Sequence, residues 1–119
     1  MKRDFRRLAA LGTLLVGLVI AGCKHEPNPP TEADAIAVWK NVHRQAAQSE
    51  LISLKKINGQ MATVNGVKLY TLYYTATYKA TKDIGIHHAG WVDTYQSNYP
   101  FEWTEKGWRG PDDQVYPEH

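Results

Sequence analysis

Cysteine is nearly missing from this chain of 119 residues, which contains Cys23 and no other. A single cysteine excludes an internal disulfide, although small secreted domains commonly depend on disulfides for stability. Long hydrophobic runs are scarce as well, because the longest uncharged apolar run covers residues 8–20. A helix of that length spans about 20 Å, short of the ~30 Å hydrocarbon core of a bilayer. The run therefore has the length of a signal-peptide core rather than of a transmembrane helix.

The sequence also lacks the signatures of common enzymes and metal sites. It contains no G-x-S-x-G, Walker or dinucleotide-binding glycine motif, and no H-x-x-H spacing. His87 and His88 are adjacent and would point to opposite sides of a strand, so we expect a solvated loop pair, no metal and no cofactor. Two pairs of acids are expected on the surfaces of turns: Glu102 with Glu105, and Asp112 with Asp113. A hydrolytic enzyme is therefore the least favoured class.

The excess of positive charge is confined to the start of the chain. Of 14 basic and 12 acidic residues, four basic and one acidic precede residue 8, which leaves ten and eleven from Cys23 onward. This nearly neutral remainder has no basic surface for binding phosphates. We therefore expect no nucleic-acid partner.

Residues 1–22 have the layout of a bacterial signal peptide, with a short basic segment followed by the apolar run. The run closes with Ile20-Ala21-Gly22-Cys23, which resembles the lipobox of bacterial lipoproteins. The resemblance implies cleavage between Gly22 and Cys23 and attachment of acyl chains to the Cys23 thiol. Two chains are enough for stable anchoring in a membrane. Because Lys24 replaces the aspartate associated with inner-membrane retention, the resemblance implies the outer membrane of a Gram-negative envelope, facing the periplasm.

The next segments predict a tether and a helix. Residues 23–30 are expected to form the lipidated cysteine and an extended tether rich in proline. Thr31 is the expected N-cap, with acidic side chains following in the first turn. Apolar residues spaced by three and four then predict an amphipathic helix that runs to about Ser49: Ala35, Trp39, Val42 and Ala46.

From Leu51 the apolar period changes to two, which predicts antiparallel strands. The expected strands cover residues 51–57, 67–80, 90–95, 99–104 and 108–109, with segment 60–64 leading into the second of them. Turns are expected at Asn58-Gly59, Asn65-Gly66, Ser97-Asn98 and residues 105–107. One face of strand 67–80 is expected to pack on the helix: Tyr70, Leu72, Tyr74, Ala76 and Tyr78. We therefore predict a single α+β domain at 31–119, with one N-terminal amphipathic helix packed on a curved antiparallel sheet of four or five strands.

Aromatic residues crowd the C-terminal third of the chain. On an exposed face they could stack on sugars or anchor a protein partner. For any single one of them, a place in the core of the sheet and its cross-strand pairs is the favoured interpretation. The candidate residues for such a binding face are Trp91, Tyr95, Tyr99, Trp103 and Trp108.

Two stretches resemble small exported bacterial proteins of uncharacterised function: residues 54–60 (LKKINGQ) running into 66–76 (GVKLYTLYYTA), and residues 104–110 (TEKGWRG). The outline resembles cystatin-like or NTF2-like α+β domains. The resemblance covers about half of the predicted mature chain and rests on strand and turn residues. It implies a fold and carries no functional residues.

The leading functional hypothesis is a non-enzymatic lipoprotein that binds a protein or cell-wall partner or supports the envelope. The motivation is the predicted anchor and tether together with the aromatic-rich sheet. The alternative is an inhibitor or immunity protein that acts against a cell-wall hydrolase or a periplasmic toxin.

Overall fold

The computed structural model describes residues 26–43, 48–83 and 85–119. The predicted signal peptide, its cleavage site after Gly22 and the lipidation site at Cys23 lie outside the described residues. The described elements are helix α2 (Glu32–His43) and strands β1 (Ser49–Val64), β2 (Val67–Ala80), β3 (Val92–Thr104), β4 (Gly107–Arg109) and β5 (Val115–Tyr116). No helix in these three segments is long and apolar enough to cross a membrane.

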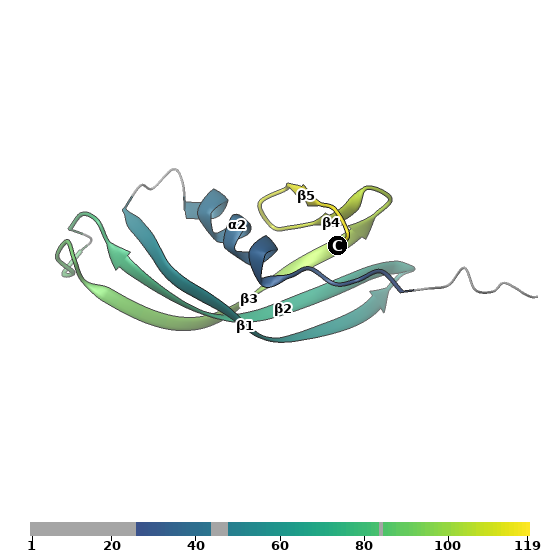
Figure 1. Ribbon diagram of the computed structural model, residues 1–119, viewed down its shortest axis with the longest axis horizontal. Helices are drawn as coiled ribbons and strands as arrows, with labels where there is room; N and C mark the ends of the chain where they lie inside the picture. The colour runs from purple at the N-terminus through teal and green to yellow at the C-terminus, as the bar shows by residue number, and fades with distance from the viewer. Residues whose placement is uncertain (1–25, 44–47, 84) are drawn as a thin grey trace, which may run out of the picture.

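The strands form one antiparallel sheet in the order in which they occur in the chain. Strands β1 to β3 are long and bend along their length, and α2 lies over their concave side together with β4 and β5 (Figure 1). The expected α+β class and the curved antiparallel sheet are therefore confirmed, with five strands and, within the described ranges, one helix.

Helix α2 begins where its capping residues predict. The Asp34 backbone N–H donates to Thr31 Oγ1 at 3.4 Å, and the Thr31 N–H donates to the Asp34 carboxylate at 2.9 Å. This reciprocal pair satisfies two N–H groups that a helix start leaves without partners. The helix predicted to run to about Ser49 is described as far as His43, and Ser49 already belongs to β1. Residues 44–47, which include the predicted stripe residue Ala46, lie outside the described residues.

Strand β1 owes its bend to two bulges. Its register against β2 skips one residue at Ile52 and again at Ile57. Each bulge places two residues of one strand opposite one residue of its neighbour, which bends the strand and increases its twist. Both isoleucine side chains are about half exposed. The bulges thus fit a long strand around the helix.

The turn expected at Asn58-Gly59 is wrong, because both residues lie inside β1. A Cβ atom at Gly59 would lie 1.6 Å from Tyr70 Oη and 2.2 Å from Cζ of the same ring. Glycine is needed at this position because the Tyr70 ring crosses directly over the strand. The second Asn-Gly pair does form the predicted hairpin turn, with positive φ angles of 52° at Asn65 and 80° at Gly66.

Strand β3 is longer than its sequence pattern predicts. The turn expected at Ser97-Asn98 is wrong, since both residues pair with β2, opposite Tyr74 and Tyr73. Their side chains are exposed and point to opposite faces of the sheet: Ser97 lies on the concave face with its partner Tyr74, and Asn98 lies on the convex face with Tyr73. The hairpin between β3 and β4 forms across Glu105 and Lys106 as predicted. Strand β5 is an element that the sequence pattern did not indicate.

The core lies between α2, the concave face of the sheet and β4. The face of β2 predicted to pack on the helix is confirmed, with its first four members buried and Tyr78 half-buried. The buried core comprises Ala35, Val38, Trp39, Leu54, Tyr70, Leu72, Tyr74, Ala76, Tyr99, Phe101 and Trp108.

Residues 26–30, predicted as part of an extended tether, pack against the domain instead of projecting from it. Pro27 and Pro30 are buried, and the Asn28 carbonyl accepts a hydrogen bond of 2.7 Å from Trp108 Nε1. The Asn28 N–H donates to the Glu118 carboxylate at 2.7 Å. The segment is therefore fastened to both the core and the C-terminal tail.

Candidate functional site

Two of the five aromatic residues predicted as a binding face belong to the core. Trp108 is 1% exposed and Tyr99 is 8% exposed. Tyr99 packs at 4.6 Å, between ring centroids, against Tyr74. Burial raises the pKa of the Tyr99 phenol above its usual value, with a further contribution from Tyr74. Neither ring is available to a ligand.

Trp103 lies half-buried at the edge of the same core, with its ring 5.1 Å from that of Trp108. The five residues therefore do not form one exposed surface. The remaining two, Trp91 and Tyr95, lie at the other end of the sheet and are half-buried.

At that end, three rings from α2, β2 and β3 and a fourth from the residue before β3 form a continuous cluster, here called the aromatic edge: Trp39, Tyr78, Trp91 and Tyr95. Tyr78 is its centre, with ring centroids at 5.9 Å from Tyr95, 6.3 Å from Trp91 and 6.5 Å from Trp39. These separations are typical of edge-to-face aromatic contacts. The Trp39 ring is buried, whereas the other three are partly open to solvent.

The aromatic edge borders a pocket of about 400 Å³ between the end of α2 and the first residues of β1 and β3. The pocket, here called the aromatic pocket, is lined by Trp39, His43, Ser49, Tyr78, Asp93 and Tyr95. Aromatic rings form its walls. Its polar groups are the His43 imidazole, the hydroxyl groups of serine and tyrosine, and the Asp93 carboxylate. A concave apolar surface with a few polar groups is the usual form of a small-ligand site.

His43 is held in one orientation and one tautomer. Its ring stacks on Trp39 at 3.9 Å with an interplanar angle of 17°. Nδ1 lies 2.8 Å from the Trp39 carbonyl oxygen. A carbonyl can only accept a hydrogen bond, so Nδ1 carries the proton and Nε2 of the neutral ring is an acceptor. The aromatic pocket thus presents an acceptor nitrogen beside the Asp93 carboxylate.

Tyr95 connects the wall of the pocket to the core. Its hydroxyl oxygen accepts a hydrogen bond of 2.8 Å from Trp39 Nε1. Burial raises the pKa of the Tyr95 phenol from 10.0 to about 12, and the bond from Trp39 opposes the rise. The phenol therefore stays neutral at physiological pH.

This shift makes stability depend on alkaline pH. Because the folded pKa exceeds the unfolded one, the contribution of Tyr95 is complete below pH 10 and is lost as pH rises through about 12. In urea unfolding at stepwise pH, the Tyr95→Phe variant should be less stable at neutral pH, because Trp39 Nε1 loses its acceptor. Between pH 10 and about 12, this variant should also lose less of its free energy of unfolding than the unaltered protein. Parallel pH profiles would contradict the assignment.

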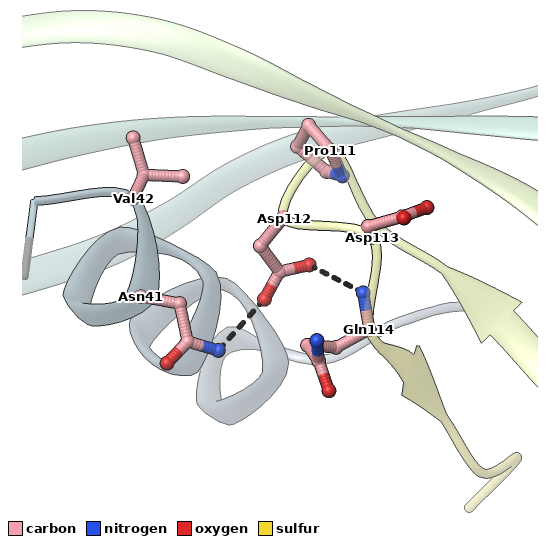
Figure 2. A pocket seen from close by; sticks show the side chains of 6 residues that line it. All are labelled: Asn41, Val42, Pro111, Asp112, Asp113 and Gln114. Carbon is pink, nitrogen blue, oxygen red and sulfur yellow. Dashed lines mark hydrogen bonds between the residues drawn. The ribbon is translucent and has the colours of Figure 1, made fainter.

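A second hollow lies between α2 and the loop that joins β4 to β5, lined by Asn41, Val42, Pro111, Asp112, Asp113 and Gln114. Figure 2 shows Asp112 pointing toward Asn41 and toward the backbone of Gln114. The Asp112 carboxylate accepts hydrogen bonds of 2.9 Å from Asn41 Nδ2 and 3.2 Å from the Gln114 N–H, and a third from the Tyr116 hydroxyl. These donors already satisfy Asp112, so this hollow is a structural junction.

The other residues considered for chemistry are dispersed. His87 stacks on Trp91 at 3.7 Å, whereas His88 is exposed. Glu102 forms a surface ion pair of 2.7 Å with Arg109, and Glu105 is exposed in a turn. In the described part of the chain, no group of three or more His, Cys, Asp or Glu residues could hold a metal ion.

The aromatic pocket could be predicted from the sequence only in part. Tyr95 was a candidate, whereas Trp39, Tyr78 and His43 carry the helical and strand periodicity of ordinary core residues. Ser49 and Asp93 have no sequence signal, because they meet only when the first residues of β1 and β3 are brought to the same end of the sheet.

Comparisons with models of protein families, with curated proteins and with solved structures found no match to this chain.

Proposed function

We propose that this protein is a lipid-anchored, periplasm-facing binding module of the outer membrane that contacts its ligand through the aromatic pocket. Support for the anchor comes from the basic segment, the apolar run and the Ile20-Ala21-Gly22-Cys23 motif. Removal of the leader would make α2 the first element of the mature chain. A helix against the concave side of a curved antiparallel sheet is consistent with the likeness to cystatin-like or NTF2-like domains, which stays a prediction.

The single observation that carries the binding proposal is the composition of the pocket. Two tyrosine rings stand beside three hydrogen-bond acceptors: His43 Nε2, the Ser49 hydroxyl and the Asp93 carboxylate. A sugar ring matches this arrangement, because its C–H face can stack on an aromatic ring while its hydroxyl groups donate to acceptors at the rim. A cell-wall glycan is therefore the ligand that fits the pocket best.

The proposal predicts that Asp93→Asn weakens glycan binding by about tenfold or more, because hydrogen bonds to a charged group contribute ~1.5–3 kcal/mol. The measurement is a titration of the full chain in detergent with soluble peptidoglycan fragments, followed by tryptophan fluorescence. Asp113→Asn, at the structural junction, is the matched control and should bind as the unaltered protein does. The glycan proposal fails if no fragment gives saturable binding, or if both variants bind alike.

The same variants address the alternative of an inhibitor or immunity protein. Such a protein would present the aromatic edge to another protein rather than to a glycan. Loss of binding to a cell-wall hydrolase in Asp93→Asn, with no glycan binding by the unaltered chain, would favour that alternative.

A further inference from the structure

The described chain begins beside the hairpin that joins β1 to β2 (Figure 1). The Glu26 carboxylate forms an ion pair of 3.1 Å with Lys68 Nζ, in the first residues of β2. Pro27 is buried next to it, and Lys56 Nζ donates to the Pro30 carbonyl at 3.2 Å. Together with the bond from Trp108 to Asn28, these contacts hold the segment along this end of the sheet.

These contacts of residues 26–30 limit the distance from the sheet that an acylated Cys23 can reach. Cys23 lies three positions before Glu26, and three extended Cα-to-Cα steps span at most about 11 Å. A lipid on Cys23 must therefore enter the bilayer close to Lys68 and the hairpin. A free tether of eight residues would have imposed no such restriction.

The tip of this hairpin is apolar where it meets solvent. Val64 and Val67 flank the Asn65-Gly66 turn and are 50% and 36% exposed. The one basic residue close to the turn, Lys68, is paired with Glu26, so the tip carries little net charge. Two valines on an uncharged tip suit the boundary between headgroups and acyl chains, where apolar side chains gain from burial.

We propose that the tip of the β1–β2 hairpin (residues 64–67) contacts the phospholipid surface to which the protein is anchored, so that the sheet stands away from the membrane. This inference rests on the lipidation proposed above. Tyr78 lies eleven residues beyond Val67 on the same strand, about 36 Å at ~3.3 Å per residue. The sheet therefore serves as the spacer, and the aromatic pocket lies at the end of the sheet that is remote from the bilayer.

The test uses two variants of the full lipidated chain that each add one cysteine to Cys23, Val64→Cys and Ile52→Cys. Both positions are on β1 and are similarly exposed, at 50% and 54%, but they lie at opposite ends of the strand. Acylation occupies Cys23, so the introduced thiol is the one that reacts with a fluorescent maleimide. In phosphatidylcholine vesicles that contain spin-labelled lipid, the probe at residue 64 should be quenched several-fold more than the probe at residue 52.

Three other results are distinguishable. Equal quenching at both positions, in protein whose intact mass shows the acyl chains, would overturn the orientation and leave the anchor standing. A mass without acyl chains would refute the anchor itself, whatever the quenching. A probe at residue 64 that is shielded from water but not quenched by lipid would indicate a second copy on the tip, and would overturn the membrane contact.

Discussion

Replacing Trp108 by alanine is expected to lower the free energy of unfolding by about 3–5 kcal/mol, the usual cost of truncating a fully buried large aromatic side chain. The ring is 1% exposed and packs against Tyr70 at 6.1 Å. Its Nε1 also donates to the Asn28 carbonyl, so the substitution leaves that acceptor without its donor. A domain of this size has only about 5–15 kcal/mol of stability in total. Urea denaturation followed by circular dichroism measures the loss.

Trp103→Ala is the matched control for this prediction. Trp103 pairs with Trp108 across β3 and β4, but it is half-buried. Less of its apolar surface leaves water on folding, so its truncation should cost clearly less. Equal losses in the two variants would show that Trp108 does not have the central place in the core that its burial indicates.

A single methyl group added at Gly59 is expected to cost about 1–3 kcal/mol, the range for overpacking a well-filled core. The new Cβ would overlap the Tyr70 ring, whose position is constrained by Trp108 on one side and by Lys56 Nζ at 5.0 Å from its centroid. A rigid buried ring cannot move aside without disturbing these neighbours. Thermal or urea unfolding of Gly59→Ala measures the effect.

The contact with Tyr70 can be isolated by a double-mutant cycle. In a Tyr70→Leu background, which removes the overlapping ring atoms, Gly59→Ala should cost much less than in the unaltered chain. Gly66→Ala serves as a second reference, because that glycine has a positive φ but no atom within 4 Å of its ideal Cβ. If the cost of Gly59→Ala is the same in both backgrounds, backbone conformation rather than the ring explains it.

The two Asn-Gly pairs show how far local sequence determines this fold. At residues 65–66 the backbone needs positive φ at both positions, so the turn prediction is confirmed. At residues 58–59 the same dipeptide lies inside a strand, because Gly59 makes room for a ring eleven positions away in the chain. The same dipeptide therefore has two structural roles, a hairpin turn at residues 65–66 and part of a strand at residues 58–59. The packing of Tyr70 against Gly59 is what distinguishes the second position from the first.

Period-two patterning predicted β2 well, because one face of that strand is buried along its length. It failed on β3, where the turn-forming residues Ser97 and Asn98 are exposed members of a continuous strand. The core position of Trp108 could not be read locally either, because its hydrogen-bond partner Asn28 lies 80 residues earlier. Long-range contacts of this kind decided which aromatic rings are buried and which border the pocket.

Among the described strands none pairs with the outer edge of β1, and a strand from another molecule could pair there. Unpaired sheet edges of this kind promote fibrous aggregation. Here the irregular residues Ile52 and Ile57 interrupt the regular spacing of donors and acceptors along β1. The N–H of Lys56 is also engaged by the Glu32 carboxylate at 2.8 Å. The distortion that bends this strand around the helix thus also discourages strand pairing between molecules.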